Sequence, residues 1–221
     1  MSRTTEMMTP QLQDYMLRHN RPQPDDVLTD LAAETASMFG DRADMQVAPE
    51  QGAFLTLLTR LLAPRLAVEV GTFTGYSSVC IARGLPEGGR LICCDLSEDY
   101  TRVARRYWER AGVADRVQLR LAPAIDTLRA LPSDVPVDLA FLDADKAGYV
   151  HYWDALLARM PSGGVLLADN VFAGGGVIDP DTDNGSTASS IRRFNDHAAG
   201  DDRVELAMLP IADGLTIARR I

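Results

Sequence analysis

The chain has few cysteines, and it has no apolar run of the ~20 residues that a membrane-spanning helix needs. Its three cysteines, Cys80, Cys93 and Cys94, are odd in number and lack the spacing of metal ligands. Cys93 and Cys94 are adjacent in a strand-like run, so their side chains should point to opposite faces of a sheet. We therefore interpret the cysteines as thiols of the core. The N-terminal stretch MSRTTEMMTPQ lacks the apolar segment of a signal peptide, and we expect a cytoplasmic protein without membrane association.

Positive charge is scarce relative to negative charge. The formal net charge is -9 at pH 7, whereas broad nucleic-acid binding depends on clustered lysine and arginine. We therefore do not expect nucleic acid as a partner. The histidines His19, His151 and His197 show no paired spacing. We interpret His151, with Tyr152 beside it, as a packing residue on a helix rather than as a ligand.

The length and composition fit one globular domain. With 221 residues, of which 46% are hydrophobic, the chain can bury one sizeable core, and no stretch indicates a second folding unit. We predict a single domain over residues 1–221, made of an N-terminal helical extension (1–64) and an α/β core (65–221). Helices are expected in the extension at 9–19, 25–39 and 49–62. They would either cap the sheet or supply a dimer contact.

From residue 66 onward, short apolar runs alternate with segments of helical period, which is typical of parallel strands joined by helices. Several runs are apolar almost throughout, as expected for a sheet that is covered on both faces. The strands are expected at 66–70, 91–95, 117–122, 137–143 and 163–169. One helix is expected after Ser97 as its N-cap, and another from Lys146 to Met160. The runs 204–211 and 215–221 flank an Asp-Gly turn and predict an antiparallel hairpin.

The first strand ends in EVGTFTGYS, residues 69–77. Its two glycines lack the G-x-G-x-x-G spacing that brings a backbone against a pyrophosphate, so a nicotinamide dinucleotide is disfavoured. Glycines beside a helix N-terminus suit a small anionic group, such as the carboxylate of S-adenosylmethionine, although a tight turn also needs glycine for steric reasons. Asp95 closes the second strand, where an acid commonly accepts the hydroxyls of a ribose. After the third strand, the small residues 122–124 leave room for an adenine or simply begin a helix.

Two later strands end in aspartates, Asp143 and Asp169, and Asn170 follows directly. If these strands are neighbours, their carboxyl ends lie side by side and three oxygen donors converge. Oxygen-only ligation selects hard cations, and Mg²⁺ keeps several non-protein ligands, which leaves adjacent positions for a vicinal diol. Helix capping or local ion pairing is the alternative for each aspartate taken singly.

Lys146 follows Asp143 closely, so a helix that begins there would aim its amine at the same site. A phenol ionises near pH ~10, and both a dication and an adjacent lysine favour the phenolate. Lys146 is therefore a candidate general base or phenolate stabiliser, with an exposed helix lysine as the alternative. The glycine-rich segment 171–186 is interpreted as a mobile loop over the acceptor site, or else as a disordered surface loop.

The motifs EVGTFTGYSS, LICCD, FLDADK, LLADNV and LPIADGLTIARRI occur in this order in a region that extends from about Val47 to the C-terminus. Together they resemble the cation-dependent, caffeoyl-CoA-type O-methyltransferases, a family that includes bacterial natural-product enzymes and is related to catechol O-methyltransferase. The resemblance implies a Rossmann-like class I methyltransferase fold. This α/β fold has a seven-stranded, mostly parallel sheet with a C-terminal antiparallel hairpin and N-terminal helices. The resemblance also implies a homodimer.

The resemblance further implies a role for each matching residue. Asp143, Asp169 and Asn170 would hold the metal, which is expected to be Mg²⁺ or another divalent cation such as Ca²⁺ or Mn²⁺. Lys146 would be the catalytic lysine, with Asp143 beside it. The S-adenosylmethionine site would comprise Val47, Glu69, Gly71, Thr72, Ser77, Asp95, Ala124, Asp143 and Asp145.

The expected reaction is metal-dependent methylation of a hydroxyl of a catechol-like small molecule, with natural-product biosynthesis in bacteria as a candidate context. Two other functions stay open: a transfer-RNA hydroxyuridine methyltransferase of the same family, and a non-catalytic nucleoside-binding protein. One departure concerns the acceptor. Where the family often has a tryptophan after the Asp-Asn pair, this chain has Ala173. We take this to favour a polycyclic or amino-acid-derived catechol over a caffeoyl thioester.

Overall fold

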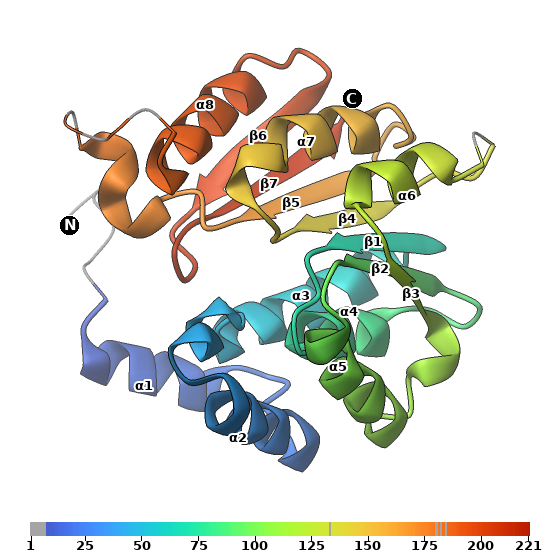
Figure 1. The fold of residues 1–221 in the computed structure, drawn as a ribbon, viewed down its shortest axis with the longest axis vertical. Coiled ribbons are helices and arrows are strands. Elements are labelled where there is room, and N and C mark those ends of the chain that lie inside the picture. Colours follow the sequence, from blue (N-terminus) through green and yellow to red (C-terminus); the bar gives the residue numbers. More distant parts are fainter. Residues whose placement is uncertain (1–7, 133, 180, 182, 184) are drawn as a thin grey trace.

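A computed structural model describes residues 8–132, 134–179, 181, 183 and 185–221. A seven-stranded sheet with the order β3-β2-β1-β4-β5-β7-β6 runs through its centre (Figure 1). The strands are β1 (Leu66–Val70), β2 (Arg90–Asp95), β3 (Val117–Leu121), β4 (Leu139–Leu142), β5 (Val165–Asp169), β6 (Val204–Leu209) and β7 (Leu215–Arg220). This is the predicted α/β fold, and the expected strands lie where the apolar runs placed them.

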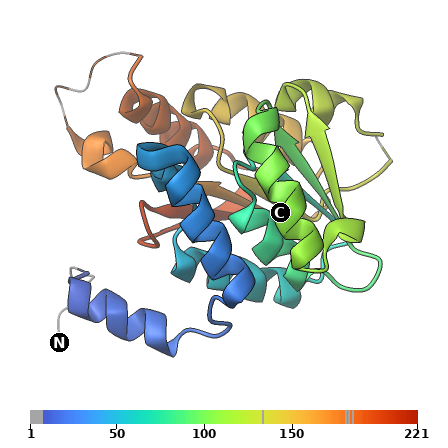
Figure 2. The ribbon, with the colours of Figure 1, turned by 60° about the horizontal axis from the view of Figure 1, so that its bottom comes forward.

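Helices cover both faces of the sheet (Figure 1). One layer contains α2 (Asp26–Phe39), α3 (Pro49–Leu62), α4 (Tyr76–Gly84) and α5 (Glu98–Arg110), with the short helix η1 (Gly40–Met45) between α2 and α3. The other layer contains α6 (Ala124–Ala130), α7 (Tyr149–Leu157) and α8 (Thr187–Ala199). Helix α1 (Pro10–His19) buries no residue and projects away from the sheet (Figure 2). Shorter helical turns are η2 (Ala114–Arg116), η3 (Lys146–Gly148) and η4 (Ala173–Ile178).

The middle strands of the sheet are buried on both faces. Every residue of β1, β4 and β5 is buried, because side chains that alternate along each strand pack against one or the other helical layer. The adjacent cysteines illustrate this alternation, since Cys93 belongs to the core with α4 and α5, and Cys94 belongs to the core with α6 and α7. All three cysteines are free and buried, and burial raises the pKa of Cys80 and of Cys94 to about 12. The interpretation of the cysteines as core thiols is confirmed.

The strand order reverses between β1 and β4. The chain runs outward from β1 through β2 to β3, then returns to β4 on the other side of β1. In open parallel sheets, this reversal opens a crevice beyond the carboxyl ends of the strands, and ligands bind there. The fold therefore places the ends of β1 and β4 at the expected ligand site.

The predicted hairpin is confirmed at the C-terminus. Strand β7 pairs antiparallel with both β5 and β6, so it lies between them in the sheet. The connecting turn has positive φ at Ala212 (48°) and Gly214 (84°), and Gly214 is packed so closely against Phe172 that a Cβ would lie 2.6 Å from its ring. This turn lies beside the end of β5, because Leu215 pairs with Asp169.

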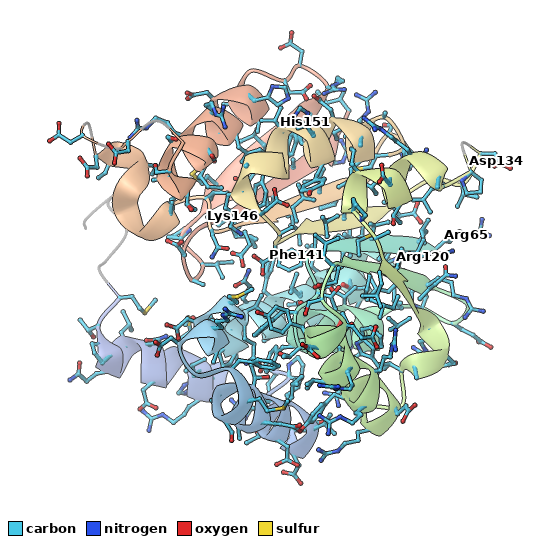
Figure 3. The ribbon with its side chains drawn as sticks, viewed as in Figure 1. Arg65, Arg120, Asp134, Phe141, Lys146 and His151 are labelled. Carbon is cyan, nitrogen blue, oxygen red and sulfur yellow. The ribbon has the colours of Figure 1, made fainter. Side chains whose placement is uncertain are left out.

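Two sequence expectations need correction. The helix expected from Lys146 to Met160 is a short turn, η3, followed by α7, which ends at Leu157. The interpretation of His151 as a packing residue is wrong, since its side chain is exposed and points away from the sheet (Figure 3). In the described part of the chain, no helix combines the length and apolar character that a membrane crossing requires.

Candidate active site

A cavity of about 830 Å³ lies beyond the carboxyl ends of β1, β2, β4 and β5. Eleven of the twelve predicted site residues line it, and Glu69 is the exception. The lining residues among the predictions are Val47, Gly71, Thr72, Ser77, Asp95, Ala124, Asp143, Asp145, Lys146, Asp169 and Asn170. One cavity therefore contains both the expected cofactor residues and the expected reactive residues.

The turn after β1 meets the end of β4 at Gly71. Its φ is 91°, and a Cβ there would lie 2.1 Å from the carbonyl oxygen of Asp143. Only glycine combines this backbone conformation with so close an approach. The glycine therefore brings the cofactor turn directly against the strand end that carries Asp143.

Asp95 organises the same turn. One of its carboxylate oxygens accepts hydrogen bonds from the backbone N–H groups of Thr72 (2.9 Å) and Phe73 (2.8 Å). The other oxygen accepts from the N–H of Ser97 (2.8 Å), and Ser97 in turn caps α5 through a bond from the N–H of Tyr100 (3.2 Å). Asp95 thus fixes two turns at the cavity wall while its own side chain faces the cavity.

Glu69 lies behind the cavity wall with no exposed surface. Neither carboxyl oxygen has a hydrogen-bond partner of ordinary geometry among the described residues. Burial raises the pKa of Glu69 to about 8, although the neighbouring hydroxyls of Ser77 and Thr72 lower it somewhat. The side chain is therefore mainly protonated at neutral pH and lacks a partner for its polar atoms.

Asp143 and Asp169 come from neighbouring strands, because Leu142 pairs with Ala168 in the β4–β5 ladder. Burial raises the pKa of Asp143 to about 7, while Lys146 lowers it and the charge of Asp169 raises it. Burial also raises the pKa of Asp169. The two carboxyls thus lie near enough to repel each other when both are ionised.

Asn170 adopts a left-handed backbone conformation directly after β5, with a φ of 56°. Its N–H donates to Oδ1 of Asp169 at 2.7 Å. Asparagine tolerates this conformation better than most residues. The turn places an amide side chain beside the two aspartates at the cavity wall.

Lys146 is the single lysine of the chain. Its Nζ donates to Oδ1 of Asp143 (3.0 Å) and to the hydroxyl of Tyr149 (2.7 Å), and the side chain is 15% exposed. The Tyr149 hydroxyl also lies within hydrogen-bond distance of the carbonyl oxygens of Leu142 (3.1 Å) and Asp169 (3.2 Å). Figure 3 shows Lys146 at the end of the sheet opposite Arg65, which immediately precedes β1. The lysine is therefore held at the reactive end and is not an exposed helix lysine.

Both carboxylate oxygens of Asp145 accept hydrogen bonds. They accept from the N–H of Gly148 (2.9 Å) and from the hydroxyl of Tyr152 (2.7 Å). Tyr152 itself lines the cavity, so it does more than pack. This pair forms part of the cavity wall.

Several lining residues were not predicted as site residues from the sequence. The segment from η1 to the first turn of α3 contributes Asp44, Met45, Gln46, Ala48 and Gln51 in addition to Val47, and the hairpin turn contributes Ala212 and Asp213. Ala212 and Asp213 belong to the motif LPIADGLTIARRI, but the motif does not show that they line a cavity, because that depends on how the hairpin and the N-terminal helices pack on the sheet. Among them only Val47 was indicated, by the family resemblance.

The segment 171–186 differs from the expected loop. The part from Val171 to Asp179 is fixed to α8, since Arg192 donates to the carbonyl oxygens of Val177 (2.9 Å) and Asp179 (2.7 Å). The backbone N–H groups of Phe172 and Gly174 donate hydrogen bonds to Asp213 of the hairpin turn. None of the described residues of the segment lines the cavity, and neither does Ala173. Residues 180, 182 and 184 of the expected mobile loop lie outside the described residues.

The donors present fit the expected ligands. Two carboxylates and an amide form an oxygen-only set that suits a hard dication, and a dication would relieve the repulsion between Asp143 and Asp169. The hydroxyl of Thr72, which lines the cavity and has no hydrogen-bond partner among the described residues, suits a ligand with polar groups.

The sheet order, the hairpin and the cavity at the β1–β4 reversal define a Rossmann-like methyltransferase. A family model described as O-methyltransferase matches residues 20–221. The chain is 34% identical, over 228 residues, to a probable caffeoyl-CoA O-methyltransferase 1 of Dictyostelium discoideum, with 98% of this chain and 99% of that protein covered.

Two solved structures are similar in fold and in sequence. The O-methyltransferase of Bacillus cereus in complex with SAH has a TM-score of 0.86 and 32% identity, and the match covers 96% of this chain and 97% of that one. The O-methyltransferase TomG of Streptomyces achromogenes, involved in tomaymycin synthesis and solved with SAM, has a TM-score of 0.85 and 33% identity, with 96% and 99% covered. This chain belongs to the O-methyltransferase family and is an S-adenosylmethionine-dependent O-methyltransferase of the caffeoyl-CoA type.

Proposed function

We propose that the protein transfers a methyl group from S-adenosylmethionine to one hydroxyl of a catechol-like small molecule, with Mg²⁺ as the metal. The observation that carries this proposal is the convergence of Asp143, Asp169, Asn170 and Lys146 in the cavity that also contains the cofactor residues. A non-catalytic nucleoside-binding protein would have no need of this reactive set.

The residues divide into two groups. Gly71, Thr72, Ser77, Asp95, Ala124, Asp145 and Val47 would hold the cofactor, with Glu69 behind them. Asp143, Asp169 and Asn170 would hold Mg²⁺, or Ca²⁺ or Mn²⁺ in its place. When bound, the dication would lower the pKa of a hydroxyl that it contacts.

Lys146 would stabilise the acceptor oxygen as its anion. The carboxylate of Asp143 and the hydroxyl of Tyr149 orient its amine. Transfer to this oxygen is an in-line displacement, so the main task of the protein residues is alignment of the two reactants.

The charge of the cavity supports a small acceptor that carries no phosphates. Its lining contains one cationic side chain, Lys146, among the described residues. The lining acids are Asp44, Asp95, Asp143, Asp145, Asp169 and Asp213. An acyl-CoA or a transfer RNA brings several phosphates, which this lining would repel. We therefore favour a free catechol, such as an intermediate of bacterial natural-product synthesis, over both alternatives.

We also propose a homodimer. Apolar side chains are exposed on α1 and α3, including Leu12 (42%), Tyr15 (56%), Leu57 (51%) and Leu61 (74%). A second copy that covers them would remove apolar surface from water. Sedimentation analysis of the protein tests this proposal.

The function is tested with a panel of catechols and S-adenosylmethionine, with and without a chelator, and the products are read by mass spectrometry. We expect methylation that the chelator abolishes and that added Mg²⁺ restores. Asp169→Ala should lose the metal-dependent turnover, because a ligand to the cation is removed. Full activity in the presence of chelator would refute the metal-dependent mechanism, and methylation of bulk transfer RNA would favour the alternative substrate.

A further inference from the structure

Gln51 is a buried polar residue at the cavity wall. It lies in the first turn of α3, two residues after Pro49, and is 1% exposed. Its side-chain nitrogen, Nε2, has no hydrogen-bond partner among the described residues. Buried donors are rarely left without a partner, so an unpaired donor at a ligand site indicates a missing or rearranged acceptor.

The position of Gln51 is fixed by tight packing of α3 against α4. The neighbouring Gly52 allows this approach, since a Cβ there would lie 2.8 Å from the ring of Tyr76 and 3.0 Å from the sulfur of Cys80. One turn further, the hydroxyl of Thr56 donates to the carbonyl oxygen of Cys80 at 3.0 Å. Helix α3 therefore presents Gln51 from a rigid support.

A suitable acceptor for this donor is the carboxylate of Asp169. Both residues line the cavity, and the side chain of Gln51 interacts with Asp169 without reaching ordinary hydrogen-bond geometry. One oxygen of Asp169, Oδ1, already accepts from the N–H of Asn170 at 2.7 Å. The second oxygen remains as an acceptor for the Gln51 amide.

We propose that Gln51 is a positioning residue for the metal site: its Nε2–H donates to Asp169 and holds that carboxylate in its ligating orientation. This inference rests on the proposed function, in which Asp169 is a metal ligand. Outer partners of this kind orient metal ligands and contribute to metal affinity. The N-terminal helices would thus complete a metal site whose ligands all lie at or directly after the ends of β4 and β5.

The test is the affinity of the purified protein for Mn²⁺, measured by electron paramagnetic resonance without cofactor or acceptor. Gln51→Met keeps the length of the side chain and removes the donor, and we expect roughly tenfold to hundredfold weaker binding. Thr59→Val is the matched control. It removes a buried hydroxyl from the same helix, one that donates only within the helix, to Leu55 at 2.7 Å. Its affinity should equal that of the wild type.

Gln51→Asn is the second variant in case Gln51→Met does not fold. It keeps the amide on a side chain that is one methylene shorter, so the affinity of this variant for Mn²⁺ should also fall. An unchanged Mn²⁺ affinity in either folded variant overturns the inference. An unchanged affinity with a raised KM for the acceptor also overturns it, because Gln51 would then contact the acceptor. If the wild type itself binds no Mn²⁺, it is the proposed metal dependence that fails.

Discussion

At the scale of single residues, the raised pKa of Glu69 predicts how the stability of the fold depends on pH. Burial raises its pKa from 4.5 to about 8, so the folded protein keeps a proton there that the unfolded chain releases. The contribution of this bound proton to the free energy of unfolding is complete below pH 4.5 and is lost as the pH rises through 8. At about 1.4 kcal/mol per pKa unit, the loss is on the order of a few kcal/mol.

Glu69→Gln replaces the carboxyl by a neutral group of the same shape. In urea unfolding without cofactor, this variant should be more stable than the wild type at high pH and similar to it at low pH. Asp143 also has a raised pKa, of about 7, but it is present in both proteins, and only its charge interaction with Glu69, the smallest of the causes of the Glu69 shift, enters the difference. The same pH dependence in both proteins would show that Glu69 is already ionised in the folded state.

Some residues of the site could be predicted from the sequence, and others could not. Asp143, Asp169 and Asn170 were predictable because each follows an apolar strand, and parallel strands place their carboxyl ends at one edge. Tyr149 and Gln51 were not predicted as site residues, because neither follows a strand. Tyr149 reaches Lys146 only because η3 and α7 return over the end of β4, and Gln51 reaches the cavity only because α3 packs closely on α4.

At the scale of elements, the fold follows from patterns that the sequence shows directly. Buried strands read as apolar runs, Ser97 caps α5 as expected, and the Asp-Gly turn forms the hairpin. The segment after β5 departs from the expected mobile loop because Arg192, from a helix further along the chain, binds its carbonyl oxygens. A glycine-rich composition does not reveal such distant partners.

The contact between the β1 turn and the end of β4 can be tested at Gly71. Gly71→Ala adds both backbone strain at a positive φ and a Cβ 2.1 Å from the backbone of Asp143. Gly88→Ala is the matched control, since Gly88 also has a positive φ (77°) but has open space around it. The control should lose about 1 to 3 kcal/mol of unfolding free energy. Gly71→Ala should lose more and bind S-adenosylmethionine poorly, as urea unfolding and calorimetry would show. Equal losses would mean that the close approach is unimportant.

At the scale of the whole molecule, negative charge is concentrated where the substrate enters. The chain has a formal charge of -9, and all of its cationic side chains except Lys146 are arginines, none of which belongs to the described cavity lining. Asp44 of η1 is exposed at the cavity, whereas Asp41 of the same helix does not line it. Such a field attracts cationic small molecules and repels anionic ones over a distance that salt shortens.

The charge preference of the acceptor site follows from this field. Three catechols that carry an ammonium group, no charge or a carboxylate should show kcat/KM in decreasing order, and high salt should reduce the differences. Asp44→Asn should lower the advantage of the ammonium compound roughly twofold to fivefold, because one charge at the cavity is removed. Asp41→Asn changes the net charge equally and should leave that advantage intact. If both variants behave alike, the net charge of the protein governs access; if neither changes the order, the acceptor is selected by shape alone.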